Sequence, residues 1–323
     1  MSHFALRLAR AATILSLVLL GALPCRAVPK PESAAPTVLP APTPRGPLAE
    51  MERDSCPVSA STTAEARARL ASSPADPAAY LELAKLARQA GDPAIAAQTL
   101  EDGRRNATPC PALLVALGES YILLNRLADA EEATQAALQL DQTTPGAQLQ
   151  LGRIYELIGW TESAVECYEK AVAQAPQDAT GQCALVMGLI AAGRAAAAER
   201  QCRAYLEASA ANADLWIGLG ESLEAQQKLR DAFNAYGRAL AANDQSAGAH
   251  ARRGRLYCRF GQFDAATAAC LAALACDPDC ALAHAYLGIA YAYQGEEGAA
   301  REHALRAQQA GMRMDPVWDR LAQ

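Results

Sequence analysis

Small and apolar residues recur along this chain with a period of 34. Counted from residues 77, 111, 145, 179, 213, 247 and 281, position 20 is alanine in all seven units and position 7 is leucine in six. Five units have glycine at position 15, where a helix is expected to stop and turn. A unit of this length holds one helix, a turn, a second helix and a second turn, so the pattern predicts seven helical hairpins.

Glycine also occupies position 8 in five units, at Gly118, Gly152, Gly220, Gly254 and Gly288. Glycine inside a helix costs about 1 kcal/mol relative to alanine, so the packing must require it. Hydrophobic residues make up 51 % of the chain and aromatic residues only 5 %. We therefore expect the glycines to let the first helix of each hairpin pack close to the second, with the alanines of position 20 on the facing side.

The chain resembles the tetratricopeptide repeat family at these positions. The fifth unit reads WIGLGESL over 216–223, followed by Ala232, Tyr236 and Ala239, and the third reads LGRIY over 151–155. Local departures are Val186 for glycine, Tyr205 for alanine and Arg253 for leucine. The resemblance implies an all-α, right-handed α-solenoid with seven repeats over 77–314. We expect a capping helix over 62–76 and the start of another over 315–323.

The N-terminus has the plan of a secretory signal peptide over residues 1–27, with cleavage after Ala27. Its apolar run of about thirteen residues is short for a membrane span, which needs about twenty. An uncleaved anchor, or a lipid on Cys25, would instead hold the chain at a membrane. The Pro/Ala-rich stretch 28–61 is expected to be a disordered linker or spacer.

Charge and motifs exclude several classes of function. The formal net charge is -6, which argues against general nucleic-acid binding. The sequence contains no phosphate-binding loop, no H-E-x-x-H helix and no nucleophile elbow, so we expect neither an enzyme nor a bound cofactor. His250 and His284 fall at position 4, where a packing role is preferred over a metal site, and no metal is expected.

Nine cysteines remain after cleavage of the leader, enough for disulfides in an oxidising compartment. Cys276 and Cys280 are the preferred pair, because they flank a turn that contains proline, and Cys56 with Cys110 is a second candidate. Cys167, Cys202 and Cys270 lie at or beside position 24 and are expected to be small core residues.

In this family the first helices line a concave groove, and the resemblance places positions 2, 5, 9, 12 and 13 on it. The groove is expected to bind a protein or peptide partner. Position 9 reads Lys, Glu, Arg, Met, Glu, Arg and Ile, which does not match the Lys and Asn cluster of relatives that bind C-terminal carboxylates. The candidate partner-binding residues are Lys85, Arg88, Glu119, Arg153, Glu156, Met187, Glu221, Glu224, Arg255, Arg259 and Tyr293.

The sequence therefore predicts an exported, periplasmic or secreted scaffold or adaptor that binds proteins through this groove. The alternative is a membrane-anchored subunit of a bacterial envelope machine for secretion, pilus assembly or polysaccharide export. Membrane attachment is expected only if the leader is retained or Cys25 is lipidated.

Overall fold

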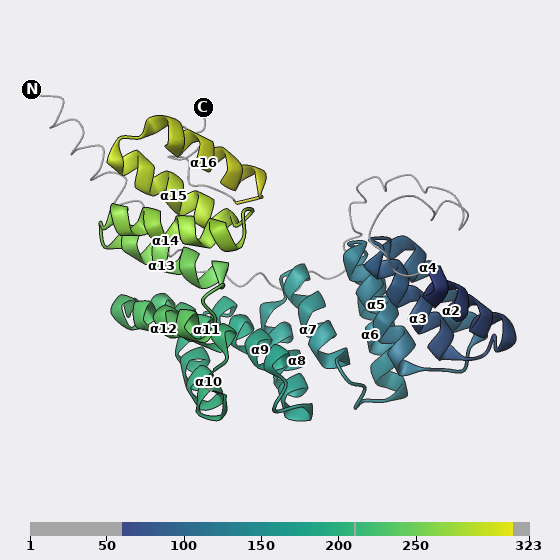
Figure 1. The fold of residues 1–323 in the computed structure, drawn as a ribbon. Helices are drawn as coiled ribbons and strands as arrows, with labels where there is room; N and C mark the ends of the chain where they lie inside the picture. The colour runs from purple at the N-terminus through teal and green to yellow at the C-terminus, as the bar shows by residue number, and fades with distance from the viewer. Residues whose placement is uncertain (1–59, 210, 313–323) are drawn as a thin grey trace, which may run out of the picture. The chain divides into compact units, whose positions relative to one another are not determined.

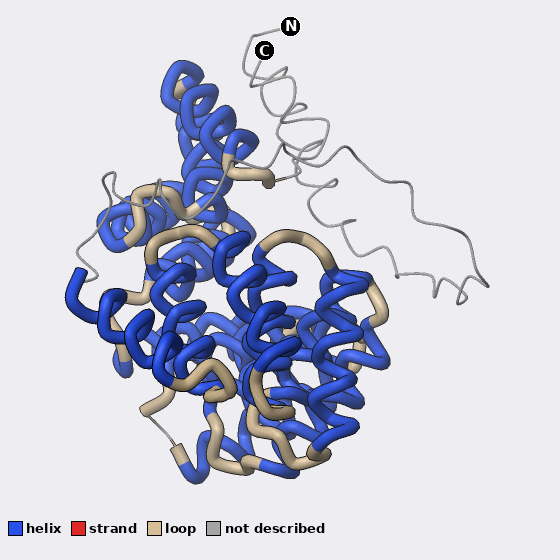
Figure 2. Tube along the Cα trace, turned by 90° about the vertical axis from the view of Figure 1, so that its right-hand side faces the viewer, coloured by secondary structure: helices blue, strands red, loops and turns tan. Residues whose placement is uncertain are grey.

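The computed structural model describes residues 60–209 and 211–312, and these residues lie in helices or in the loops between them (Figure 2). No strand occurs in this part of the chain. The described helices are α2 (Ala60–Ser72), α3 (Pro77–Gln89), α4 (Pro93–Asn106), α5 (Pro111–Leu123), α6 (Leu127–Leu140), α7 (Ala147–Ile158), α8 (Thr161–Gln174), α9 (Ala179–Ala191), α10 (Ala195–Ala208), α11 (Ala213–Ala225), α12 (Leu229–Ala242), α13 (Ala247–Arg259), α14 (Phe263–Cys276), α15 (Ala281–Gln294) and α16 (Glu297–Gln309).

The described residues form two compact units, one up to Gly188 and one from Leu189 onward, so that the boundary falls inside α9. In the first unit α3 pairs with α4, α5 with α6 and α7 with α8, and each pair packs on the next (Figure 1). In the second unit α11 pairs with α12, α13 with α14 and α15 with α16 in the same way. The expected all-α repeat solenoid is confirmed.

Helix starts in the first repeats follow from local sequence. Pro77 and Pro93 are the first residues of α3 and α4, where a missing N–H is tolerated. The Asp76 carboxylate accepts a hydrogen bond from the Ala78 backbone N–H, and that of Asp92 from the Ile95 N–H. Each side chain thus satisfies an N–H that the helix leaves without a partner.

Parts of the sequence prediction lie outside the described residues. These parts are the leader over 1–27, most of the linker over 28–61 and the second capping segment over 315–323. Helix α2 spans Ala60–Ser72, where a capping helix was expected over 62–76. No described helix is both long enough and apolar enough to cross a membrane.

Four of the five position-8 glycines face the side chain at position 24 of the same hairpin, whereas Gly288 lies nearest the Ala300 carbonyl at position 20. A Cβ atom on Gly152 would lie 2.6 Å from Cδ1 of Tyr168, and one on Gly220 would lie 2.6 Å from Cδ1 of Tyr236. Both tyrosines are fully buried. The alanines of position 20 are also buried, with at most 1 % exposed in any of the seven repeats. The close approach was predicted correctly, but in four of the five hairpins the atom nearest the glycine belongs to position 24 rather than to the alanine of position 20.

The turn between the two helices of a hairpin needs a left-handed residue at position 15. The five glycines there have φ between +72° and +91°. In the second and fifth repeats the same position holds Asn125 and Gln227, with φ of +57° and +63°. The turn therefore keeps its geometry where the sequence does not supply glycine.

Candidate functional site

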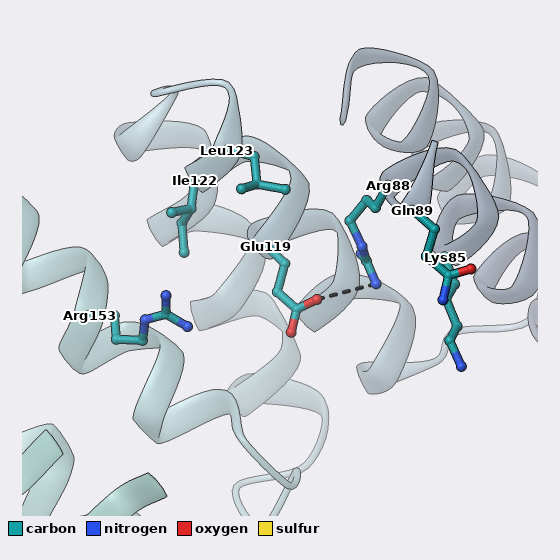
Figure 3. A pocket seen from close by; sticks show the side chains of 7 residues that line it. All are labelled: Lys85, Arg88, Gln89, Glu119, Ile122, Leu123 and Arg153. Carbon is teal, nitrogen blue, oxygen red and sulfur yellow. Dashed lines mark ion pairs between the residues drawn. The ribbon is translucent and has the colours of Figure 1, made fainter. Parts of the chain in front are cut away.

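Four predicted binding residues meet in one pocket of the first unit. Lys85 and Arg88 come from α3, Glu119 from α5 and Arg153 from α7, so three consecutive first helices contribute (Figure 3). Ile122 and Leu123 of α5 and Gln89 of α3 complete the lining, and the pocket encloses about 360 Å³. We call this set of seven residues the α3–α5–α7 pocket.

The charges of the α3–α5–α7 pocket are only partly compensated. Nη2 of Arg88 lies 3.3 Å from Oε2 of Glu119, and Nη1 of Arg88 donates to the Ala116 carbonyl at 3.1 Å. Lys85 and Arg153 form no ion pair with any described residue, and both side chains are exposed. Figure 3 shows Glu119 between the side chains of Arg88 and Arg153. The pocket thus carries three cations and one anion.

The spacing of the ion pairs explains why Arg153 is unpaired. In this repeat geometry position 12 of one first helix contacts position 9 of the next, 31 residues later, as Arg88 contacts Glu119 and Glu224 contacts Arg255. The residue 31 before Arg153 is Ile122, which offers no charge. Because Ile122 at position 12 is apolar, Arg153 at position 9 of the following repeat has no counterion.

In the second unit the predicted binding charges neutralise one another. Arg255 Nη2 lies 2.7 Å from Glu224 Oε2, and Arg259 Nη1 lies 3.4 Å from Glu224 Oε1. Nε of Arg252, a residue outside the sequence prediction, donates to Glu221 Oε1 at 2.6 Å. The side chains of this cluster are 12–23 % exposed. Glu221, Glu224, Arg255 and Arg259 therefore hold α11 and α13 together rather than presenting unpaired charges.

Three further predicted residues have separate surroundings. The Glu156 carboxylate accepts a hydrogen bond of 2.8 Å from the hydroxyl of Tyr168. Met187 on α9 is 39 % exposed. The Tyr293 ring stacks on that of Phe263 with a centroid distance of 4.2 Å, so that it contributes to packing between α14 and α15. None of the three lines the α3–α5–α7 pocket.

Position 4 of the repeat makes hydrogen bonds that the sequence did not indicate. His284 Nε2 lies 3.0 Å from the Pro278 carbonyl oxygen, and His250 Nε2 lies 3.0 Å from that of Asp244. The Tyr80 hydroxyl and the Gln182 amide donate to the carbonyls of Pro74 and Pro176, again six residues earlier. In four repeats position 4 therefore satisfies a carbonyl of the preceding loop, which accounts for both histidines.

The cysteines are not paired as predicted. Cys276 and Cys280 are free, so the expected disulfide between them is absent from this structure. The Cys276 thiol lies 3.7 Å from Oε1 of Gln245, whereas Cys280 packs against a buried cluster that includes Leu287, so the two side chains have different neighbours. Cys110 is also free, and Cys56 lies outside the described residues. Cys167, Cys202 and Cys270 are buried, as expected.

No group of three or more potential metal ligands occurs within residues 60–209 and 211–312. Sequence reasoning placed Ile122 on the groove through position 12, but it missed two lining residues of the α3–α5–α7 pocket, Gln89 and Leu123. Both stand at position 13, a position already assigned to the groove, so the repeat alignment contained the information that places them there.

Two sequence models of the tetratricopeptide repeat match residues 81–146, 145–178 and 251–315. Residues of this chain are 32 % identical over 108 positions to human tetratricopeptide repeat protein 7B. That match covers 33 % of this chain and 13 % of the human protein. The chain belongs to the tetratricopeptide repeat family.

Solved structures share the fold at low sequence identity. A tetratricopeptide repeat protein from Parabacteroides merdae aligns with a TM-score of 0.64 and 18 % identity over 76 % of this chain and 96 % of that one. Yeast Tom70 aligns with a TM-score of 0.61 and 14 % identity over 80 % of this chain and 56 % of that one. Proteins of this family are mostly non-catalytic and generally act as scaffolds for protein–protein interactions. Membership in the family and the shared fold support the same general role for this chain.

Proposed function

We propose that this protein is an exported, non-catalytic adaptor that holds a partner protein against the first helices of its repeats. The observation that carries the proposal is the α3–α5–α7 pocket, to which three consecutive first helices each contribute charged side chains. A surface assembled from repeated helices with one side open to solvent suits an extended segment or a helix of another protein.

Exposure of apolar side chains supports the same surface. Leu123 is 62 % exposed at the edge of the α3–α5–α7 pocket. An exposed leucine loses unfavourable contact with water when a partner covers it, at roughly 25 cal/mol per Å² of apolar area removed. Charges at the rim add orientation and selectivity more than binding free energy.

Site-specific photocrosslinking tests this function. A photoreactive phenylalanine derivative replaces Leu123 on α5 or, as a matched control, Leu140 at the end of α6 in the same repeat, which is 53 % exposed. In extracts of the producing cell we expect Leu123 to give discrete crosslinks to another protein and Leu140 to give none. Equal crosslinking from both positions, or crosslinking from Leu140 alone, contradicts the proposal.

The exported location is the second part of the proposal, and it is supported by the basic start, short apolar run and small residues of segment 1–27. We expect intact mass measurement of the purified protein to show loss of residues 1–27, and fractionation to release it without detergent. Release only with detergent would instead favour the membrane-anchored subunit of an envelope machine.

A further inference from the structure

The α3–α5–α7 pocket has a positive charge that the rest of the chain does not share. Its three cations face one carboxylate, while the whole chain carries a formal net charge of -6. Arg88 is committed to Glu119 and to the Ala116 carbonyl, which leaves Lys85 and Arg153 for a ligand. These two cations stand on α3 and α7, on either side of α5.

The apolar side chains of the pocket lie on its middle helix, one turn C-terminal to Glu119. Ile122 and Leu123 belong to α5, the middle helix, and Leu123 has more than half of its surface in contact with solvent. A ligand that satisfies the whole pocket therefore has negative charge at both ends and an apolar group between them. A small inorganic anion would pair with a cation of the pocket but would leave Ile122 and Leu123 uncovered.

Helix spacing sets the distance between the two acidic groups. Packed helices lie about 8–10 Å apart, so two steps from α3 to α7 span roughly 16–20 Å. An extended chain advances about 3.3 Å per residue, so acids about five or six residues apart reach both cations. We propose, on the basis of the function proposed above, that this pocket binds an extended partner segment in which two acidic side chains flank a leucine-like side chain.

A protein segment fits better than the other polyanions. Nucleic acid and anionic membranes present uniform negative charge over a large area, and their binding grows with the number of basic side chains that contact them. Here two unpaired cations lie on the helices on either side of α5, which carries Ile122 and Leu123, in a chain that is acidic as a whole. Selectivity for alternating acidic and apolar side chains follows from that arrangement.

The test uses the full chain and a fluorescein-labelled, C-terminally amidated peptide of about twelve residues. Two Asp-Glu pairs, separated by about five residues, flank two leucines. One control peptide has Asn-Gln in place of each acidic pair, a second has serine in place of leucine, and a third has the acidic pairs adjacent. Fluorescence anisotropy at about 50 and about 500 mM sodium chloride measures the dissociation constants, because salt screens exposed charges.

The decisive comparison is between two double variants of equal net charge. Lys85→Glu with Arg153→Glu reverses the unpaired cations of the pocket. Lys170→Glu with Arg238→Glu reverses exposed cations on the second helices α8 and α12. We expect the first double variant to weaken binding of the acidic peptide by about tenfold or more, and the second to change it by less than about twofold. Circular dichroism checks that both variants remain helical.

We also expect each control peptide to bind wild-type protein at least about fivefold more weakly than the acidic peptide. The proposal is overturned if the neutral peptide binds as tightly, or if the pocket variant binds like the wild type. It is also overturned if a thymidine oligonucleotide or phosphatidylglycerol vesicles bind more tightly than the peptide through the same two cations. Crosslinking at Leu123 without acidic-peptide binding would leave the adaptor function standing and remove only this ligand class.

Discussion

At the scale of single residues, four of the hairpins pack through a glycine at position 8 and the side chain opposite it. The side chain at position 24 varies from Tyr168 and Tyr236 to Thr134 and Cys270, and each lies against the glycine of its own hairpin. The repeat therefore tolerates very different volumes at position 24, because the glycine supplies the room. The structure also explains Arg253 at a leucine position, since its guanidinium lies 4.5 Å from the Phe233 ring centroid.

Replacement of Gly220 by alanine should destabilise the protein. The new methyl group would overlap the ring of Tyr236, which is fully buried. Overpacking of this kind costs about 1–3 kcal/mol, which exceeds the helix-propensity gain of alanine. Urea unfolding followed by circular dichroism measures the change in the free energy of unfolding.

Gly237→Ala is the matched control, since Gly237 lies on α12 of the same repeat and a Cβ atom there meets nothing within 4 Å. It should raise the free energy of unfolding by about 0.5–1 kcal/mol. If both substitutions stabilise the protein, the close contact between Gly220 and Tyr236 is not what requires glycine.

A second residue, Glu199, gives the protein a defined acid sensitivity. Its carboxylate accepts hydrogen bonds from Lys228 Nζ at 2.9 Å, Gln226 Nε2 at 2.8 Å and Arg203 Nη2 at 2.9 Å. The hydrogen bond from Lys228 is the main reason that the pKa of Glu199 falls to about 2, helped by Gln226 and Arg203. These contacts favour the charged form, and so they stabilise the folded state only while the carboxylate is ionised.

Glu199→Gln should therefore lower the free energy of unfolding at neutral pH and have less effect in acid. The folded-state pKa lies below the ordinary value of 4.5, so the stabilisation is complete above that pH and is lost as the pH falls toward about 2. Urea unfolding of both proteins at about pH 7, 4.5 and 3 measures the difference. The control Glu207→Gln, at an exposed site on α10, should change it by less than about 0.5 kcal/mol at each pH. A constant effect of Glu199→Gln across this range contradicts the assignment.

At the scale of elements, the hairpin turn is fixed by backbone geometry. Position 15 is left-handed in all seven described repeats, and five of them have glycine there. A side chain in this conformation costs about 1–2 kcal/mol, less for asparagine, whose side chain tolerates it. Gln227 therefore carries more strain than Asn125.

Gln227→Gly should raise the free energy of unfolding by about 1 kcal/mol, because it relieves the left-handed strain at φ +63°. The gain is reduced by loss of the hydrogen bond from Arg259 Nη2 to the Gln227 side chain, which is exposed. Asn125→Gly should give a smaller increase. Thermal and urea unfolding measure both, and a loss of stability in Gln227→Gly would show that the side-chain contact outweighs the strain.

At the scale of the molecule, adjacent repeats within each unit contact one another, so the stability of a unit depends on the interfaces between its repeats. In the second unit the Glu224–Arg255 pair and the Glu221–Arg252 pair join the first helices of adjacent repeats. These ion pairs are mostly buried, and removal of one partner leaves a charge with less compensation.

Arg255→Met should therefore lower the free energy of unfolding by about 2 kcal/mol, since Glu224 keeps only the longer contact with Arg259 and the hydrogen bond from Tyr236. We also expect a shallower urea transition, because a weaker interface uncouples the repeats on its two sides. Arg238→Met, at an exposed position on α12, is the control and should change stability by less than about 0.5 kcal/mol. An unchanged transition in Arg255→Met would mean that the pair contributes nothing to the interface.

The repeat period, the helix class and the need for small residues followed from the sequence alone, because they depend on local spacing that recurs every 34 residues. The same pattern assigned Lys85, Arg88, Glu119 and Arg153 to one face of the first helices. It could not separate these residues from Glu221, Glu224, Arg255 and Arg259, which occupy positions 9, 12 and 13 of later repeats.

Only the tertiary structure decided which charges are paired, because a counterion comes from the neighbouring repeat, 31 residues away, and depends on the angle and distance between two first helices. Ile122 leaves Arg153 unpaired, whereas Glu224 neutralises Arg255. Local sequence fixed each hairpin. Contacts between hairpins decided which of these charges remain unpaired for a partner.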